Sequence, residues 1–153
     1  MTVSLRLYTG TAAGTESGAE TAIALLSVDA ASDDPTAHKI AKGTNSFEKW
    51  IRLRIDNAAG ASYSNFSLVR SGDLPTGVVI KMGVTDTPTT PTASTSAVAT
   101  TTMVAGRRYV FDAGTYDTTG QHTRYVVLQE VVAATAASGN IPQQHFTAGW
   151  QQS

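Results

Sequence analysis

The residue types that usually carry chemistry are sparse in this chain, and their spacing forms no known catalytic motif. The three histidines, His38, His122 and His145, lie far apart and lack the spacing of metal ligands. The chain has no cysteine, which excludes disulfides, thiolate catalysis and cysteine-based zinc sites. It contains no nucleophile elbow, phosphate-binding loop or zinc-protease motif. We therefore nominate no catalytic residue, cofactor site or metal ligand, and we expect that the chain is not an enzyme.

One acidic segment, DAGTYDTTG at residues 112–120, faintly resembles a loop that binds a cation through oxygen atoms. It lacks the alternating Asp/Asn pattern and the final glutamate of an EF-hand, so a solvated hairpin is the favoured interpretation. The 12 acidic residues of the chain are scattered. They neither support nor exclude the pair of carboxylates that a glycosidase needs.

The stretch NSFEKWIRLRI, residues 45–55, is the strongest candidate for a binding surface. Alternation with a period of two predicts a strand whose core face carries Phe47, Ile51, Leu53 and Ile55, and whose other face carries Glu48, Trp50, Arg52 and Arg54. Tryptophan and arginine are enriched at the energetic centres of interfaces. Trp50, Arg52 and Arg54 are therefore the candidate residues for a subunit interface.

The same face would also suit a sugar or a single-stranded nucleic acid, because aromatic rings stack on both. The alternative is that both faces of the strand are internal here. Trp50 would then close the end of the sandwich while Arg52 and Arg54 extend their charged groups outward.

Composition narrows the class of protein and of partner. The chain has 153 residues, of which 41% are hydrophobic and only 15% are charged, against roughly 25% charged in typical globular chains. The net charge of −1 argues against a nucleic-acid partner, which would require a basic excess. No apolar run is long enough for a membrane span or a signal peptide, so we expect no membrane partner and a chain made in the cytoplasm.

Most of the sequence predicts short strands separated by turns. Strands are expected at residues 3–8, 22–28, 46–55, 65–70, 78–84, 108–113, 125–132 and 145–150. Helical alternatives exist only at 19–26 and 33–43, the second limited to one turn. About eight strands with a turn every dozen residues predict an all-β fold, an antiparallel β-sandwich that is immunoglobulin-like or jelly-roll-like. A single domain is expected over residues 1–153.

Two segments of low charge leave their role open. Residues 85–103, TDTPTTPTASTSAVATTTM, suit either an extended arm on a neighbouring subunit or a long loop with a Thr-rich edge strand, the second being slightly favoured. Residues 10–21 suit either a flexible connection or an arm that becomes ordered in an assembly.

The order of these features resembles a group of small β-sandwich structural proteins from the virions of tailed bacteriophages. The resemblance is carried by residues 6–18, 43–55, 65–95, 124–140 and 146–150, and so spans nearly the whole chain. It implies an immunoglobulin-like or related sandwich that works by assembly, and it supplies no catalytic residue. The terminal HFTAGWQQS departs from the more acidic tail expected for the group, which puts the C-terminal contact in doubt.

Among virion roles, the expected function is capsid decoration, also called cement. Such a protein binds the outer capsid shell and stabilises it. The expected partners are the major capsid protein and copies of the chain itself in a homo-oligomer, assembled in the host cytoplasm and retained in the virion. A tail, baseplate or fibre component is the alternative within this class. The alternative of another class is a carbohydrate-binding module that stacks sugars on Trp50 or Trp150.

Overall fold

The computed structural model of the chain is all-β and describes residues 2–31, 34, 36–139, 141–142 and 144–153. The strands are β1 (Thr2–Thr9), β2 (Thr15–Glu16), β3 (Lys49–Asn57), β4 (Tyr63–Ser71), β5 (Val78–Thr85), β6 (Thr100–Thr102), β7 (Arg108–Asp112), β8 (Tyr125–Val132) and β9 (His145–Gln152). A 3-10 turn, η1 (Thr11–Ala13), is the one helical element of the described residues. In that part of the chain, no helix has the length and apolar character needed to cross a membrane.

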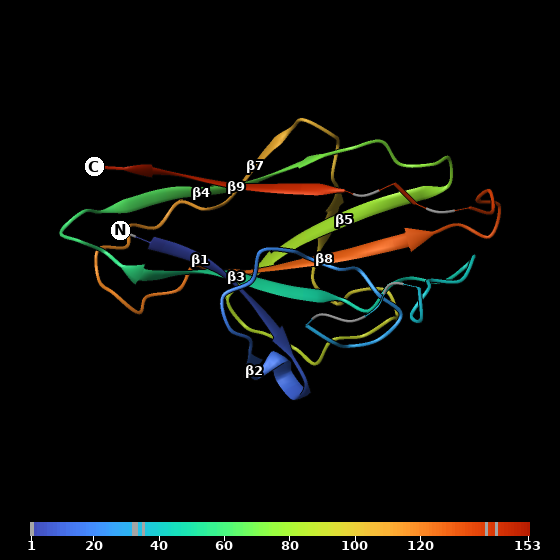
Figure 1. Cartoon of the computed structure of the whole chain (residues 1–153), viewed down its shortest axis with the longest axis horizontal. Coiled ribbons are helices and arrows are strands. Elements are labelled where there is room, and N and C mark those ends of the chain that lie inside the picture. Colours follow the sequence, from blue (N-terminus) through green and yellow to red (C-terminus); the bar gives the residue numbers. More distant parts are fainter. Residues whose placement is uncertain (1, 32–33, 35, 140, 143) are drawn as a thin grey trace.

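The strands form two antiparallel sheets, which confirms the predicted all-β sandwich class. One sheet has six strands in the order β2-β1-β3-β8-β5-β6, and the other has three in the order β7-β4-β9. Figure 1 shows the three-stranded sheet above the central strands of the larger one. Most pairings join strands distant in sequence, such as β3 with β8 and β4 with β9.

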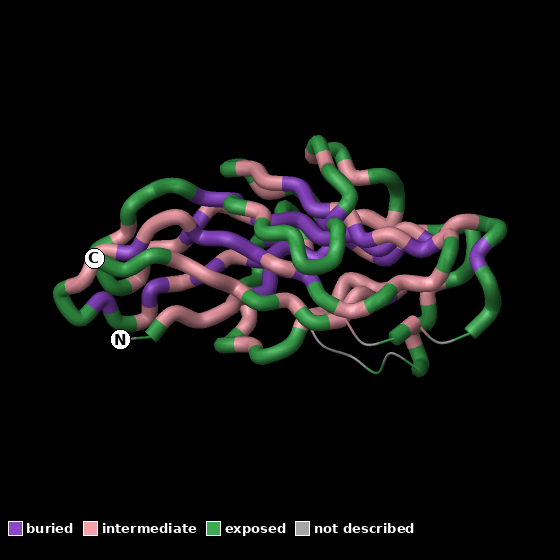
Figure 2. The backbone as a smooth tube through the Cα atoms, turned by 90° about the horizontal axis from the view of Figure 1, so that it is seen from above, coloured by how far each residue is buried: buried purple, intermediate pink, exposed green. Residues whose placement is uncertain are grey.

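The core lies between the sheets and forms as the alternation predicted. Ile51, Leu53 and Ile55 of β3 are 0–5% exposed, and they pack with residues of β4 such as Phe66 and Leu68. Each of these strands sends every second side chain inward, so apolar residues spaced by two meet in one layer. Phe47, expected on the same face, precedes β3 and is only half-buried. Figure 2 shows the buried positions running along the middle of the molecule.

The predicted strand at residues 22–28 is wrong. This segment forms no strand, although Leu26 is buried and Ile23 and Leu25 pack against the core. Its backbone hydrogen bonds reach residues outside the strands, as in the N–H of Phe47 to the carbonyl of Leu26 at 2.9 Å. The apolar side chains of the segment are thus used for packing on the core and not for strand pairing.

Segments that the sequence left open lie on the outer face of the larger sheet. The Thr-rich segment contributes the edge strand β6. In its preceding loop, the carbonyl of Thr92 accepts from the N–H of Glu48, just before β3, at 2.9 Å, and the carbonyl of Ser94 accepts from the side-chain amide of Gln129 in β8 at 2.8 Å. The N–H of Ala12 in η1 donates to the hydroxyl of Thr90 at 2.9 Å, so the two segments meet there. Together they cover part of a sheet face that would otherwise be exposed.

The two ends of the chain lie at the same end of the molecule in both views (Figures 1 and 2). Thr2 of β1 pairs with Asn57 of β3, and Gln152 of β9 pairs with Tyr63 of β4. The hairpin between β3 and β4 therefore stands between the two terminal strands.

Candidate functional site

Trp50 does not lie on an exposed face, and this corrects the expectation that it presents its ring to a partner. The side chain is 0% exposed and belongs to a small outer cluster with Tyr8, Ala13 and Val127. Its indole N–H donates to the carboxylate of Glu48 at 3.0 Å. A ring in this position is closed to direct contact with another subunit and to stacking on a sugar.

The burial of Trp50 has a local cause. At the start of β3, Glu48 and Lys49 are buried as well, so both faces of the strand are covered at this point. The turn η1 supplies Ala13 to the cover, and Val98 from the Thr-rich segment packs against the same cluster. The alternative considered from sequence, internal faces on both sides, therefore describes Trp50.

Trp150, the other tryptophan considered for sugar stacking, lies partly buried on the core side of β9. It packs against the main core, and its ring lies 6.4 Å from that of Phe66 at an angle of 35°.

Arg52 lies further along the same face and is held within the chain. Its guanidinium carbon lies 4.4 Å from the centre of the Tyr125 ring, within cation–π distance. Its Nε donates to the carbonyl of Thr123 at 2.5 Å. These contacts orient the guanidinium over β8 and leave it partly exposed.

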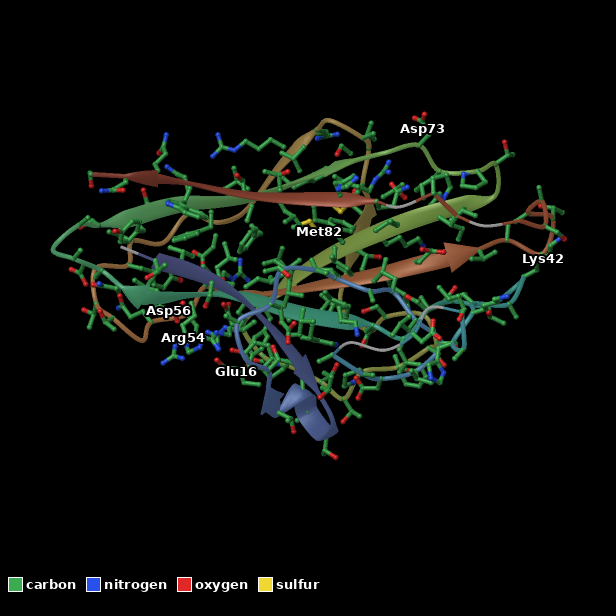
Figure 3. All side chains as sticks on the ribbon, in the orientation of Figure 1. Glu16, Lys42, Arg54, Asp56, Asp73 and Met82 are labelled. Carbon is green, nitrogen blue, oxygen red and sulfur yellow. The ribbon has the colours of Figure 1, made fainter. Side chains whose placement is uncertain are left out.

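Arg54 is the more accessible of the two arginines, with 37% of its side chain exposed. It belongs to a charged network in which Asp56 accepts from Arg6 at 2.9 Å and lies 3.8 Å from Arg54, while Glu16 lies 3.3 Å from His122. Glu16, Arg54 and Asp56 are seen close together beside β1 and β3 in Figure 3. We name this charged surface, made of Arg6, Glu16, Arg52, Arg54, Asp56 and His122, the arginine face.

The acids of the arginine face are stabilised in their charged form. Burial alone would raise the pKa of Asp56, but hydrogen bonds from Ser4 and Arg6 and the charges of Arg6 and Arg54 outweigh it and lower that pKa. Burial would likewise raise the pKa of Glu16. Hydrogen bonds from Tyr8 and His122 outweigh this effect, so the pKa of Glu16 is also lowered. The face therefore carries both signs of charge at neutral pH.

In the acidic segment at residues 112–120, Asp112 stabilises the fold through hydrogen bonds. Asp112 is 4% exposed and accepts hydrogen bonds from the N–H of Gly114 at 2.8 Å, the hydroxyl of Tyr116 at 2.6 Å and the N–H of Arg124 at 2.7 Å. No group of three potential metal ligands occurs among the residues that the structure describes.

The three-stranded sheet presents a second surface with a different character. Its outer side carries Arg108 and Val110 of β7, Val69 of β4, and Thr147 and Gly149 of β9, in adjacent register. Val110 is 54% exposed, one of the two large hydrophobic residues of the described chain that are this exposed. Both β7 and β9 have a strand neighbour on one side only. We name this surface the β9 face.

A cleft opens elsewhere, where the segment before β3 passes beside β9. It has a volume of about 850 Å³ and is bordered by residues 21–26 and 36–40 on one side and by 144–147 on the other. Leu5 of β1 and Glu130 of β8 reach it from the six-stranded sheet. A smaller apolar cavity of about 190 Å³ shares Leu5, Ile23 and Phe146 with it, so the space extends between the sheets.

Glu130 is the unusual residue of this cleft. It is 5% exposed, and its Oε1 is buried with no hydrogen-bond partner among the described residues. Burial raises the pKa of the carboxyl to about 7. The acid therefore changes charge near neutral pH, in a space large enough for a ligand.

The sequence analysis did not single out Glu130, although a signal for it existed. The inward positions of β8 are Val126, Leu128, Glu130 and Val132. One acid on an otherwise apolar face is a departure from binary patterning. The high apolar content of the strand as a whole, YVVLQEVV, obscures this signal.

Comparison of the chain with protein-family models, with curated proteins and with solved structures found no match.

Proposed function

We propose that this chain is a non-enzymatic structural protein that works by associating with other protein subunits, and specifically a capsid decoration protein of a tailed bacteriophage. In this role it binds the outer shell through the major capsid protein and through copies of itself. A ligand that binds only the assembled shell shifts the equilibrium towards assembly, which is how such a protein stabilises a capsid.

The observation that carries the proposal is that β9 is an edge strand, with a strand neighbour on one side only. Natural proteins usually protect long edge strands with lysine, proline, bulges or a covering loop. β9 runs for eight residues, HFTAGWQQ, and contains no lysine, no proline and no acid. A second copy of this chain, pairing antiparallel along β9, would satisfy the edge and continue the sheet.

The arginine face supports a second contact in the proposal, now limited to Arg52 and Arg54. Arg54 retains enough exposure to reach a partner carboxylate. Rim charges of this kind mainly set the rate and specificity of association. Trp50 contributes only indirectly, by fixing the start of the strand that carries both arginines.

Self-association along β9 is tested with one charge placed on that edge. Thr147→Lys adds an exposed lysine to β9, whereas Thr101→Lys adds the same group to the edge strand β6 of the other sheet. Light scattering coupled to size-exclusion chromatography should show an oligomer for wild type and Thr101→Lys. Thr147→Lys should weaken it at least about ten-fold. A monomeric wild type, or equal effects of the two variants, would contradict pairing along β9.

The virion role is tested by counting copies of the chain in purified phage particles. Hundreds of copies per particle would support decoration of the shell. Tens or fewer would instead indicate a tail, baseplate or fibre component. Complete absence from particles would overturn the virion assignment altogether.

A further inference from the structure

The apolar core is interrupted where Glu130 points inward from β8. On one side Leu128 belongs to the main core, and on the other Val132 belongs to a separate end cluster with Val78 and Ala136. Protein interiors rarely contain voids much larger than a water molecule. Here the gap between the clusters opens into the cleft of about 850 Å³.

Among the residues that the structure describes, no cation is paired with Glu130, and its Oε1 has no hydrogen-bond partner. Lys49 on the adjacent strand donates instead to the carbonyl of Ala30, and burial is what raises the pKa of Glu130. Arg70 of β4 donates to the carbonyls of Met103 and Gly72 and to the side chain of Gln144. The other titratable groups that line the cleft are His38, Lys39 and His145.

We propose that this cleft binds a small organic cation, a protonated amine carried on an apolar chain, with its ammonium group paired to the carboxylate of Glu130. The apolar part lies against Ile23, Leu25 and Phe146, which are only half-buried in the chain and face the cleft. The inference does not depend on the proposed virion role.

Other ligand classes fit the described residues less well. A metal ion needs several oxygen or nitrogen ligands, and the described residues offer no group of three around Glu130. An anion would be repelled by the carboxylate. A purely apolar molecule would bury the acid further without pairing it, which is costly. The volume lies within the range of sites that enclose small molecules, about 300–1,000 Å³.

The raised pKa of Glu130 agrees with a buried carboxyl that lacks a positively charged neighbour. Without a cation nearby, burial disfavours the carboxylate, and the group holds its proton to about pH 7. A bound ammonium supplies the missing positive charge. Binding of the amine must therefore release a proton below pH 7, and affinity must rise with pH.

The test compares hexylamine with hexanol, which share an apolar chain and differ in charge. Amide shifts in heteronuclear NMR spectra of the whole chain are followed during titration at pH 8. The amide shift changes caused by hexylamine should reach saturation and should be confined to residues 21–26, 128–132 and 144–147. Hexanol should bind at least about ten-fold more weakly. Glu130→Gln keeps the shape of the side chain and removes its charge, and it should lower the affinity for hexylamine at least about ten-fold.

Asp117→Asn is the matched control, because it removes one charge from an exposed loop at the other end of the sandwich. It should bind hexylamine as wild type does. For wild type, affinity should rise about ten-fold from pH 6 to pH 8, as the ionised fraction of an acid with a pKa near 7 does. Glu130→Gln should show a markedly smaller rise in affinity over the same pH range.

Three results would overturn the proposal. The first is the absence of saturable shifts with hexylamine at pH 8. The second is equal binding of hexanol and hexylamine to wild type. The third is unchanged hexylamine affinity in Glu130→Gln. If Glu130→Gln did not fold, a flat affinity of wild type between pH 6 and pH 8 would be decisive against it.

Discussion

At the scale of single residues, Glu130 couples the stability of the chain to pH. Its pKa is about 7 in the folded chain, against 4.5 for the exposed acid. Because the folded state holds the proton more tightly, stability is greatest below the unfolded pKa and falls as pH rises towards 7. By linkage, the loss attributable to this group approaches about 3 kcal/mol.

We therefore predict that Glu130→Gln is more stable than wild type at pH 8 and that the difference shrinks towards pH 5. Urea unfolding at several pH values measures this directly. The acids of the arginine face, whose pKa values are lowered, lose their contribution only at lower pH. Asp117→Asn should follow wild type, whereas parallel curves for wild type and Glu130→Gln would contradict the prediction.

Trp50 and Arg54 lie four residues apart on one face of β3, the first buried and the second partly exposed. Trp50→Ala removes a fully buried ring and leaves Glu48 without its indole donor, so we expect a loss of about 3–5 kcal/mol in the free energy of unfolding. Arg54→Ala should change that free energy by no more than about 0.5 kcal/mol. Denaturant midpoints of both variants check this. A small loss of stability in Trp50→Ala would contradict the burial of the Trp50 ring.

At the scale of elements, alternation predicted the strands well but failed to predict what covers them. Ile51, Leu53 and Ile55 are inside as expected, because their spacing alone selects one face. The exposure of Trp50 was misjudged because its cover comes from residues more than thirty positions away in either direction, in η1 and near Val98. Such contacts depend on tertiary packing that local patterning does not encode.

The Thr-rich segment needs a residue without a side chain beneath it. A Cβ at Gly83 would lie 2.8 Å from Val98 and 2.9 Å from the carbonyl of Ala99. We predict that Gly83→Ala displaces this segment and costs about 1–3 kcal/mol, with faster amide hydrogen exchange over residues 86–102. Gly18→Ala is the matched control, since a Cβ there meets nothing within 4 Å. Equal exchange in the two variants would contradict this.

At the scale of the whole molecule, the order of strands makes folding depend on distant contacts. Lys49 pairs with Leu128, and Tyr63 pairs with Gln152. The entropy of closing such long loops must be lost before the sheets gain stability. The sandwich class was predictable from turn spacing, whereas this pairing order was not, because many orders satisfy the same alternation.

We predict that the chain refolds on the millisecond-to-second timescale typical of all-β sandwiches. Stopped-flow tryptophan fluorescence is a suitable measurement, because Trp50 and Trp150 report on opposite sheets. Both signals should develop with the main refolding phase. Refolding in microseconds would show that local contacts dominate in spite of the topology.

Because the two ends of the chain lie close together, the molecule is suited to circular permutation. A short linker joining them would cross only the end occupied by the β3–β4 hairpin, and new ends opened in the exposed loop at residues 117–120 would leave every strand continuous. Cargo fused to either end of this chain would project from that same end of the sandwich. The cleft around Glu130, which is the third residue from the C-terminal end of β8, would stay open in such a tethered form.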